Sequence, residues 1–232
     1  MRLIPITAIT AFAAALAGCG GGSGTSGIPS GGGSTGKTES TTTDVVAKAT
    51  PGCLSVPSPK PKSVKLPKPT TKLDASKTYT ATVTTNCGTF KFKLDVKDAP
   101  NTSASIEYLA SKRFYDQTIF HRIVPGFVIQ GGDPTGTGQG GPGYSTVDKP
   151  PRGTKYTTGV VAMAKTGDEA PGTAGSQFFV VTGKDAGLPP DYAVVGTVDA
   201  GMNVVQRIGK LGDQSEQPTA VVEIQRFRVS GG

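Results

Sequence analysis

The chain has 232 residues, of which 33 are Gly and 18 are Pro, so these two residues fill 51 positions, about 22% of the chain. Their average share is about 12%, which indicates that part of the chain does not form a packed core. The formal net charge is +7, but residues 78–232 hold 15 Lys and Arg against 14 Asp and Glu. Because the excess positive charge lies before residue 78, we expect no nucleic-acid partner.

The first residues predict export. Arg2 precedes an uncharged, largely apolar run of 14 residues, Leu3 to Leu16. A helix needs about 20 residues to span a bilayer, so the run predicts a cleaved signal peptide over residues 1–18. It ends in Leu16-Ala-Gly-Cys19, which resembles the lipobox of bacterial lipoproteins, whose Cys is acylated. We expect lipid attachment at Cys19 and a domain held outside the cytoplasm at a bacterial cell membrane; the alternative is an ordinary signal peptide with a chance Cys.

Residues 19–77 have the composition of a linker. Nine of the 17 residues from Gly20 to Gly36 are Gly, which predicts a flexible, disordered tether. From Pro51 to Pro69 there are six Pro and four Lys, which predicts an extended, self-repelling spacer. Its lysines either attract an anionic lipid or wall polymer or only keep the linker solvated, and the sequence leaves both interpretations open. We expect the folded domain to begin at residue 78.

Two cysteines remain if Cys19 is acylated. Cys53 lies in the linker, and Cys87 lies in a predicted hairpin turn. An even number of thiols in an oxidising compartment favours a disulfide between them. The alternative is two unpaired surface thiols.

The predicted elements begin with two strands of period two, residues 79–85 and 89–96. Pro100 opens a predicted helix that ends near Phe114, and a second amphipathic helix covers residues 204–211. Six further strands are predicted at residues 118–124, 127–130, 158–164, 177–182, 193–198 and 221–229. About eight strands without a regular strand–helix alternation predict a mainly β protein, a closed eight-stranded antiparallel β-barrel capped by two α-helices.

Three common kinds of site are disfavoured. Residues 136–141 fit the pattern G-x-G-x-x-G, but Pro142 and Gly143 follow and no helix begins there to bind a pyrophosphate. The single His and two distant Cys offer no metal-ligand spacing, and no G-x-S-x-G motif accompanies His121. We therefore expect no metal and no cofactor.

Two stretches carry unusual polar residues. Phe120-His-Arg-Ile-Val-Pro-Gly-Phe-Val-Ile-Gln-Gly-Gly-Asp133 places Arg122 in an apolar run, and Gly175-Ser-Gln-Phe-Phe179 places Gln177 beside two aromatic residues. A guanidinium in an apolar run is costly unless it pairs with an acid or faces a cleft, and these two interpretations stay open. Both stretches, with Val161-Ala-Met-Ala164, Val195-Gly196 and Gly201-Met-Asn-Val-Val205, closely resemble the cyclophilin family of peptidyl-prolyl isomerases over about residues 78–230.

The resemblance implies an eight-stranded barrel capped by two helices that rotates X-Pro bonds in exported or unfolded proteins, without a cofactor and as a monomer. It implies that Arg122 donates a hydrogen bond to the prolyl nitrogen and that Gln130 binds substrate backbone and orients Arg122. A pocket for the proline ring would be formed by Phe127, Met163, Phe179 and Leu188. Further substrate contacts would come from His121, Val128, Ala164, Lys165, Gln177 and Tyr192. The alternative is a non-catalytic module that binds proline peptides or acts as a holdase chaperone at the membrane surface.

The sequence departs from the family pattern at three positions. Gly187 stands where many members have Trp, Tyr192 where many have His, and Lys165 where Asn is common. Because cyclosporin-type ligands use that Trp, the resemblance implies weak cyclosporin binding with isomerase activity retained.

Overall fold

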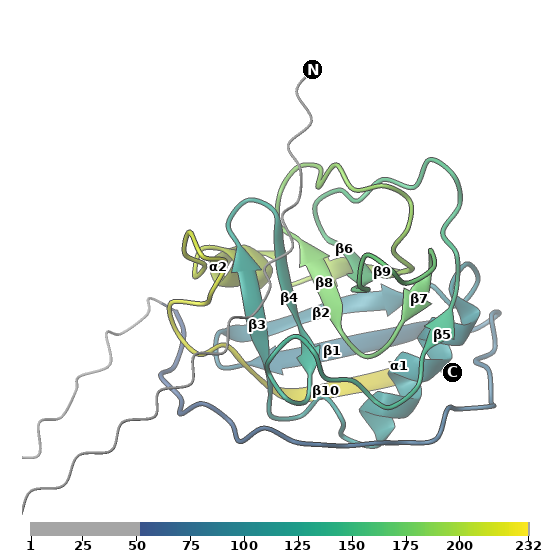
Figure 1. Ribbon diagram of the computed structural model, residues 1–232, viewed down its shortest axis with the longest axis horizontal. Helices are drawn as coiled ribbons and strands as arrows, with labels where there is room; N and C mark the ends of the chain where they lie inside the picture. The colour runs from purple at the N-terminus through teal and green to yellow at the C-terminus, as the bar shows by residue number, and fades with distance from the viewer. Residues whose placement is uncertain (1–51, 232) are drawn as a thin grey trace, which may run out of the picture. The chain divides into compact units, whose positions relative to one another are not determined.

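The computed structural model of the protein describes residues 52–231, so the expected signal peptide, Cys19 and the Gly-rich tether lie outside the described residues. Eight strands close into a barrel in the order β1-β10-β3-β4-β8-β6-β9-β2, as Figure 1 shows. Neighbouring strands are antiparallel throughout. The expected closed antiparallel barrel with two helices is confirmed. No helix among residues 52–231 combines the length and the apolar character needed to cross a membrane.

The predicted elements match the observed ones closely. The barrel strands are β1 (Tyr79–Thr85), β2 (Gly88–Leu94), β3 (Thr118–Val124), β4 (Val128–Asp133), β6 (Val160–Met163), β8 (Phe178–Val181), β9 (Val194–Ala200) and β10 (Glu223–Gly231). The helices are α1 (Pro100–Ser111) and α2 (Met202–Gly209). A small two-stranded sheet of β5 (Thr146–Val147) and β7 (Thr173–Ala174) was not expected.

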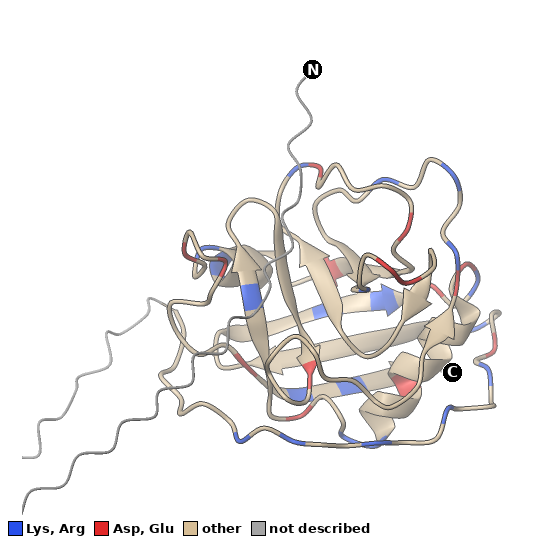
Figure 2. Ribbon diagram, in the orientation of Figure 1, with Lys and Arg blue, Asp and Glu red and all other residues tan. Residues whose placement is uncertain are grey.

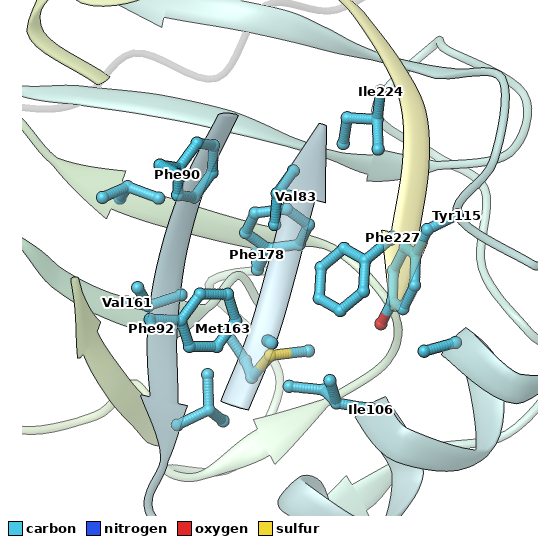
Figure 3. Packing of buried hydrophobic residues seen from close by; sticks show 14 of the residues in the cluster. Val83, Phe90, Phe92, Ile106, Tyr115, Val161, Met163, Phe178, Ile224 and Phe227 are labelled. Carbon is cyan, nitrogen blue, oxygen red and sulfur yellow. The ribbon is translucent and has the colours of Figure 1, made fainter. Parts of the chain in front are cut away.

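The barrel interior is filled by aromatic side chains (Figure 3). In β2, Phe90, Phe92 and Leu94 are buried while the lysines between them are exposed, as period two requires. Tyr115 stacks on Phe227 at 4.6 Å between ring centroids, and other rings in the interior meet edge to face. These contacts fix the strands on which the candidate site lies.

Residues 53–73, which we call the strap, lie against the outside of the barrel. Cys53 and Cys87 form a disulfide, and the backbone N–H of Leu66 donates to the carbonyl of Pro142 at 2.8 Å. Val64, Leu66 and Leu73 pack against the core. Figure 1 shows the strap running past β10 and α1. The strap therefore packs on the barrel domain that was expected to begin at residue 78, and its start is bonded to that domain at Cys87.

The strap combines an inward apolar side with an outward basic side. Val56, Pro59 and Pro69 are half-buried like Val64, Leu66 and Leu73, whereas Lys60, Lys65, Lys68 and Lys72 are exposed. Figure 2 shows these positive charges spaced along the strap. Lys62 is the exception, since its Nζ donates to the carbonyls of Phe114 and Asp116. An extended chain can alternate in this way without pairing into a sheet, and its composition indicated only that it would be an extended, self-repelling spacer.

Candidate functional site

Three neighbouring strands bring the main candidate residues together. Arg122 on β3 lies opposite Gln130 on β4, and Gln130 lies opposite Phe179 on β8. The β3–β4 register shifts between Ile119 and Arg122. Such bulges re-aim side chains, and here His121 and Arg122 are both partly exposed in succession before Ile123 turns inward.

A chain of hydrogen bonds crosses the site. Arg122 donates from Nη1 to Gln130 Oε1 at 3.3 Å, and Gln130 donates from Nε2 to Gln177 Oε1 at 3.2 Å. Gln177 then donates to the carbonyls of Gly138 and Gly140 at 2.9 and 3.0 Å. The two glutamines and Arg122 are thus held in one connected arrangement.

The guanidinium of Arg122 both pairs with an acid and faces the site. Its Nε donates to Glu216 Oε2 at 2.6 Å, and its Cζ lies 6.0 Å from the centroid of the Phe127 ring. Both interpretations of Arg122 are therefore correct, because its guanidinium pairs with an acid and also faces the site. Sequence analysis did not find Glu216, because a contact across 94 residues in a loop leaves no local pattern.

An apolar cluster separate from the barrel core lies beside Arg122. Its buried members are Val128, Tyr156, Val160, Ala162, Phe179 and Val181, and its partly buried members are Phe127, Ala164, Ala186, Leu188, Tyr192 and Val194. Phe127 and Leu188 keep part of their surface exposed. An apolar ring of a peptide can therefore reach this cluster from solvent.

Met163 does not belong to this cluster, in contrast to its expected place in the proline pocket. It is fully buried in the barrel core, near Phe92 (Figure 3). The reason is the alternation of strand β6, on which Ala162 joins the outer cluster and Met163 faces the opposite side. The residues of β6 on this face are therefore Val160 and Ala162, and Ala164 follows just after the strand.

Tyr192 closes one side of the apolar cluster. Its ring meets Phe179 edge to face at 5.6 Å, and Lys165 Nζ lies 5.5 Å from its centroid. Tyr156 fixes the backbone of Tyr192, since its hydroxyl donates to the Tyr192 carbonyl and accepts from the Tyr192 N–H. A Cβ added at Gly187 would meet no atom within 4 Å apart from its chain neighbours, so a side chain at this position would begin in open space.

A polar cavity of about 570 Å³ adjoins the apolar cluster. It shares Gln130, Ala164, Lys165 and Gln177 with the candidate site. The N–H of Ala164 is already used, because it donates to the carbonyl of Gln177 at 2.9 Å. The Gln177 amide and the Lys165 ammonium also donate to backbone carbonyls. The cavity is therefore a polar surface next to the apolar cluster, along which a peptide backbone extending from an apolar ring would lie.

His121 packs under the loop of residues 135–140. The carboxylate of the buried Asp133 accepts backbone N–H groups of Thr135, Gly138 and Gly140 at 2.6 to 3.1 Å. Burial acts to raise the pKa of Asp133, but these hydrogen bonds outweigh it and the pKa lies below its ordinary value. Burial lowers the pKa of His121, Asp133 opposes this shift, and Arg122 adds to it. His121 is therefore a neutral ring supporting the loop at neutral pH.

The described residues 52–231 contain no group of three potential metal ligands among His, Cys, Asp and Glu side chains. The site consists of a cation held at an apolar cluster, with amide side chains alongside. Such an arrangement can bind an apolar ring and direct a hydrogen bond at an atom next to it.

Comparison with known proteins agrees with this arrangement. The family described as "Cyclophilin type peptidyl-prolyl cis-trans isomerase/CLD" matches residues 80–229. Peptidyl-prolyl cis-trans isomerase-like 1 of Neurospora crassa is 41% identical over 152 residues, covering 63% of this chain and 91% of that protein. Peptidyl-prolyl cis-trans isomerase A of Mycobacterium tuberculosis is 40% identical over 172 residues, covering 66% and 93%.

Solved structures show the same fold. A cyclophilin type peptidyl-prolyl cis-trans isomerase of Cryptosporidium parvum superposes with a TM-score of 0.61 at 31% identity, covering 66% of this chain and 98% of that one. The same protein was also solved in the presence of the dipeptide Ala-Pro, with a TM-score of 0.60.

Proposed function

The chain belongs to the cyclophilin family and is a cyclophilin-type peptidyl-prolyl cis–trans isomerase, and from this premise we propose that Arg122 supplies its catalytic hydrogen bond. Rotation of an X-Pro bond is slow because its partial double-bond character imposes a barrier of about 18–20 kcal/mol. In the twisted transition state this resonance is lost, and the prolyl nitrogen gains a lone pair. A donor to that nitrogen stabilises the twisted state more than either planar state, which is what catalysis requires.

The observation that carries the proposal is the position of the Arg122 guanidinium. It lies 6.0 Å over the Phe127 ring, next to the apolar cluster, and is linked to Gln130. A proline ring seated on Phe127, Phe179 and Leu188 would bring its nitrogen near this cation. A relative was solved in the presence of the dipeptide Ala-Pro, which supports a proline-containing ligand for this site. No nucleophile or proton transfer enters this mechanism.

The test is Arg122→Ala in the full chain, with exchange of a proline peptide measured by NMR. Removing a transition-state donor costs about 10²–10³ in rate, so we expect a loss of that order with an unchanged fold. Arg226→Ala is a matched control, since Arg226 is an exposed arginine on β10. Catalysed exchange at the wild-type rate in Arg122→Ala would exclude this role for Arg122.

The cellular setting of the activity is a second part of the proposal. The lipobox-like sequence at residues 16–19 supports acylation of Cys19, and thus an isomerase held at the outer face of a bacterial membrane, acting on exported proteins. Mass spectrometry of the membrane fraction should find a diacylated Cys19 that Cys19→Ser lacks. A soluble, unmodified mature chain would contradict this part alone.

A holdase role is separable from isomerisation. If client binding were the physiological function, Arg122→Ala would still rescue a deletion phenotype, because the apolar cluster remains intact. If isomerisation were the function, the variant would fail to rescue while still binding clients. Once the loss of isomerisation rate in Arg122→Ala is known, this rescue experiment therefore distinguishes the two biological roles.

Weak binding of cyclosporin is a further proposal. The open space at Gly187 supports it, because no side chain there offers the contact that the family's Trp provides. Calorimetric titration should give a much weaker affinity than for a relative that carries Trp. Tight binding would contradict the proposal without affecting the isomerase mechanism.

A further inference from the structure

The loop between α2 and β10 is folded tightly against β3. The N–H of Ile123 donates to the carbonyl of Glu216 at 3.0 Å. Within the loop, Asp213 Oδ1 accepts the N–H groups of Ser215 and Gln217 at 2.8 and 3.0 Å, and the Asp213 N–H donates to the Gln217 carbonyl. The backbone of residues 213–217 is therefore fixed beside the strand that carries Arg122.

Glu216 has an unusual backbone conformation within this loop. Its φ is +65°, in the left-handed region that non-Gly residues seldom adopt. Such a conformation is retained only where the surrounding structure determines it, and it is common at functional sites. Here the N–H of Glu216 donates to Asp213 and its carbonyl accepts from Ile123, while its side chain reaches Arg122.

The contact with Glu216 determines which N–H groups of Arg122 remain for a substrate. Glu216 accepts from Nε at 2.6 Å and Gln130 accepts from Nη1 at 3.3 Å. The first is a short charge-assisted bond and the second is long, so Glu216 makes the stronger restraint. Nη2 has no hydrogen-bond partner in the part of the chain that the structure describes. A planar guanidinium held at Nε and Nη1 presents Nη2 in a fixed direction.

We propose that Glu216 is a positioning residue for Arg122. This inference rests on the proposed role of Arg122. A hydrogen bond to a twisted prolyl nitrogen is directional, and a long arginine side chain left unrestrained would sample many rotamers. Glu216 restricts that freedom before the substrate binds. Its negative charge also weakens the field of the cation, but a neutral acceptor in the same place would keep the orientation.

The contribution of this pair to folding is expected to be small, which makes the inference testable. The side chains of Arg122 and Glu216 are 33% and 48% exposed. Exposed ion pairs contribute about 0–1 kcal/mol to stability, because water and salt screen them. A large effect of Glu216 on catalysis would therefore not follow from a loss of fold.

The experiment compares Glu216→Ala, Glu216→Gln and Glu216→Gly in the full chain by NMR exchange of a proline peptide. We expect Glu216→Ala and Glu216→Gly to lower kcat about tenfold with KM nearly unchanged. Glu216→Gly suits the left-handed backbone, so it keeps the test valid if Ala disturbs the loop. Glu216→Gln should keep at least half of kcat, because its side-chain oxygen still accepts from Nε. Glu107→Ala on α1 is the control carboxylate.

A double-mutant cycle separates this inference from the function on which it rests. If Glu216 acts through Arg122, Glu216→Ala has no further effect in an Arg122→Ala background. The Arg122 Nε–H resonance should also lose its hydrogen-bonded shift in Glu216→Ala. A wild-type rate in Glu216→Ala, or an equal rate loss in both backgrounds, overturns the positioning role while leaving Arg122 as the donor. A wild-type rate in Arg122→Ala overturns the donor role itself.

Discussion

Cys53 and Cys87 are joined by a disulfide across 34 residues of sequence, which attaches the start of the strap to the turn between β1 and β2. Asn86, next to Cys87, reinforces the attachment: its side chain donates to the Leu54 carbonyl at 2.7 Å and accepts the N–H of Glu223 at 2.9 Å. The beginning of the strap is thus held by a covalent bond to Cys87 and by hydrogen bonds to Asn86, which is itself bonded to β10.

Removing the disulfide should therefore destabilise the domain. In the chain-entropy description, closing a loop of this length lowers the entropy of the unfolded chain and contributes about 3–4 kcal/mol. We expect Cys53→Ser with Cys87→Ser to lower the free energy of unfolding by about that amount, measured by urea denaturation. Adding a reductant should lower the free energy of unfolding of the wild type to the value of the variant, and it should leave the value of the variant unchanged. Equal midpoints for variant and oxidised wild type would contradict this expectation.

The strap should contribute to stability through its inward residues only. Leu66 is partly buried against the core, whereas Lys68 two residues later is exposed. Because removing apolar surface from water is favourable, we expect Leu66→Ala to lower the free energy of unfolding by about 1 kcal/mol or more. Lys68→Ala should change it by less than about 0.5 kcal/mol. Two equal, negligible effects would mean that the strap is not packed in solution.

The sequence predicted the barrel because its strands carry strong local signals. In β2 the alternation of Phe and Lys fixes both the strand and the face it buries. The two-residue strands β5 and β7 are too short to carry a pattern, so they were missed. The Pro and Lys content of the strap indicated only an extended spacer, and its packing was not expected, because its few apolar residues find partners only once the barrel exists.

The candidate site was predicted in part, for a related reason. Arg122 and Gln130 stand out as polar residues in an apolar run, and the structure brings them together. Met163 was assigned to the wrong side of the barrel, although alternation along the predicted strand 158–164 could have separated it from Ala164. Glu216 was not found, because only the folded chain places its loop beside β3.

The correction at Met163 leads to a contrast between two substitutions. Met163 is fully buried in the barrel core, so Met163→Ala should cost about 2–5 kcal/mol of stability. The folded fraction should still isomerise a proline peptide at a near wild-type rate. Leu188 lies partly exposed in the apolar cluster, so Leu188→Ala should raise KM several-fold with little loss of stability. Urea denaturation and NMR exchange on both variants check this. If Met163→Ala raised KM and Leu188→Ala lowered stability instead, Met163 would belong to the pocket.

His121 is the only histidine of the chain, so its titration can be followed without interference. Burial lowers its pKa below the ordinary value of 6.5. On acidification the unfolded chain therefore takes up a proton near pH 6.5, while the folded chain takes it up only at lower pH. The contribution of the neutral imidazole to stability is therefore complete above about pH 6.5. It decreases with falling pH until the imidazole of the folded chain is also protonated.

We therefore expect the free energy of unfolding to decrease below about pH 6.5, with a slope of at most about 1.4 kcal/mol per pH unit. The NMR shift of the single imidazole should titrate below 6.5 in the folded protein. His121→Gln should remove this slope, because a carboxamide does not titrate. The carboxylate of Asp133 also has a lowered pKa, but its contribution to stability is lost only at more acidic pH. The effects of His121 and Asp133 therefore occur in different pH ranges. A pKa of the imidazole at or above 6.5 would contradict the neutral, partly buried state of His121 beside the loop.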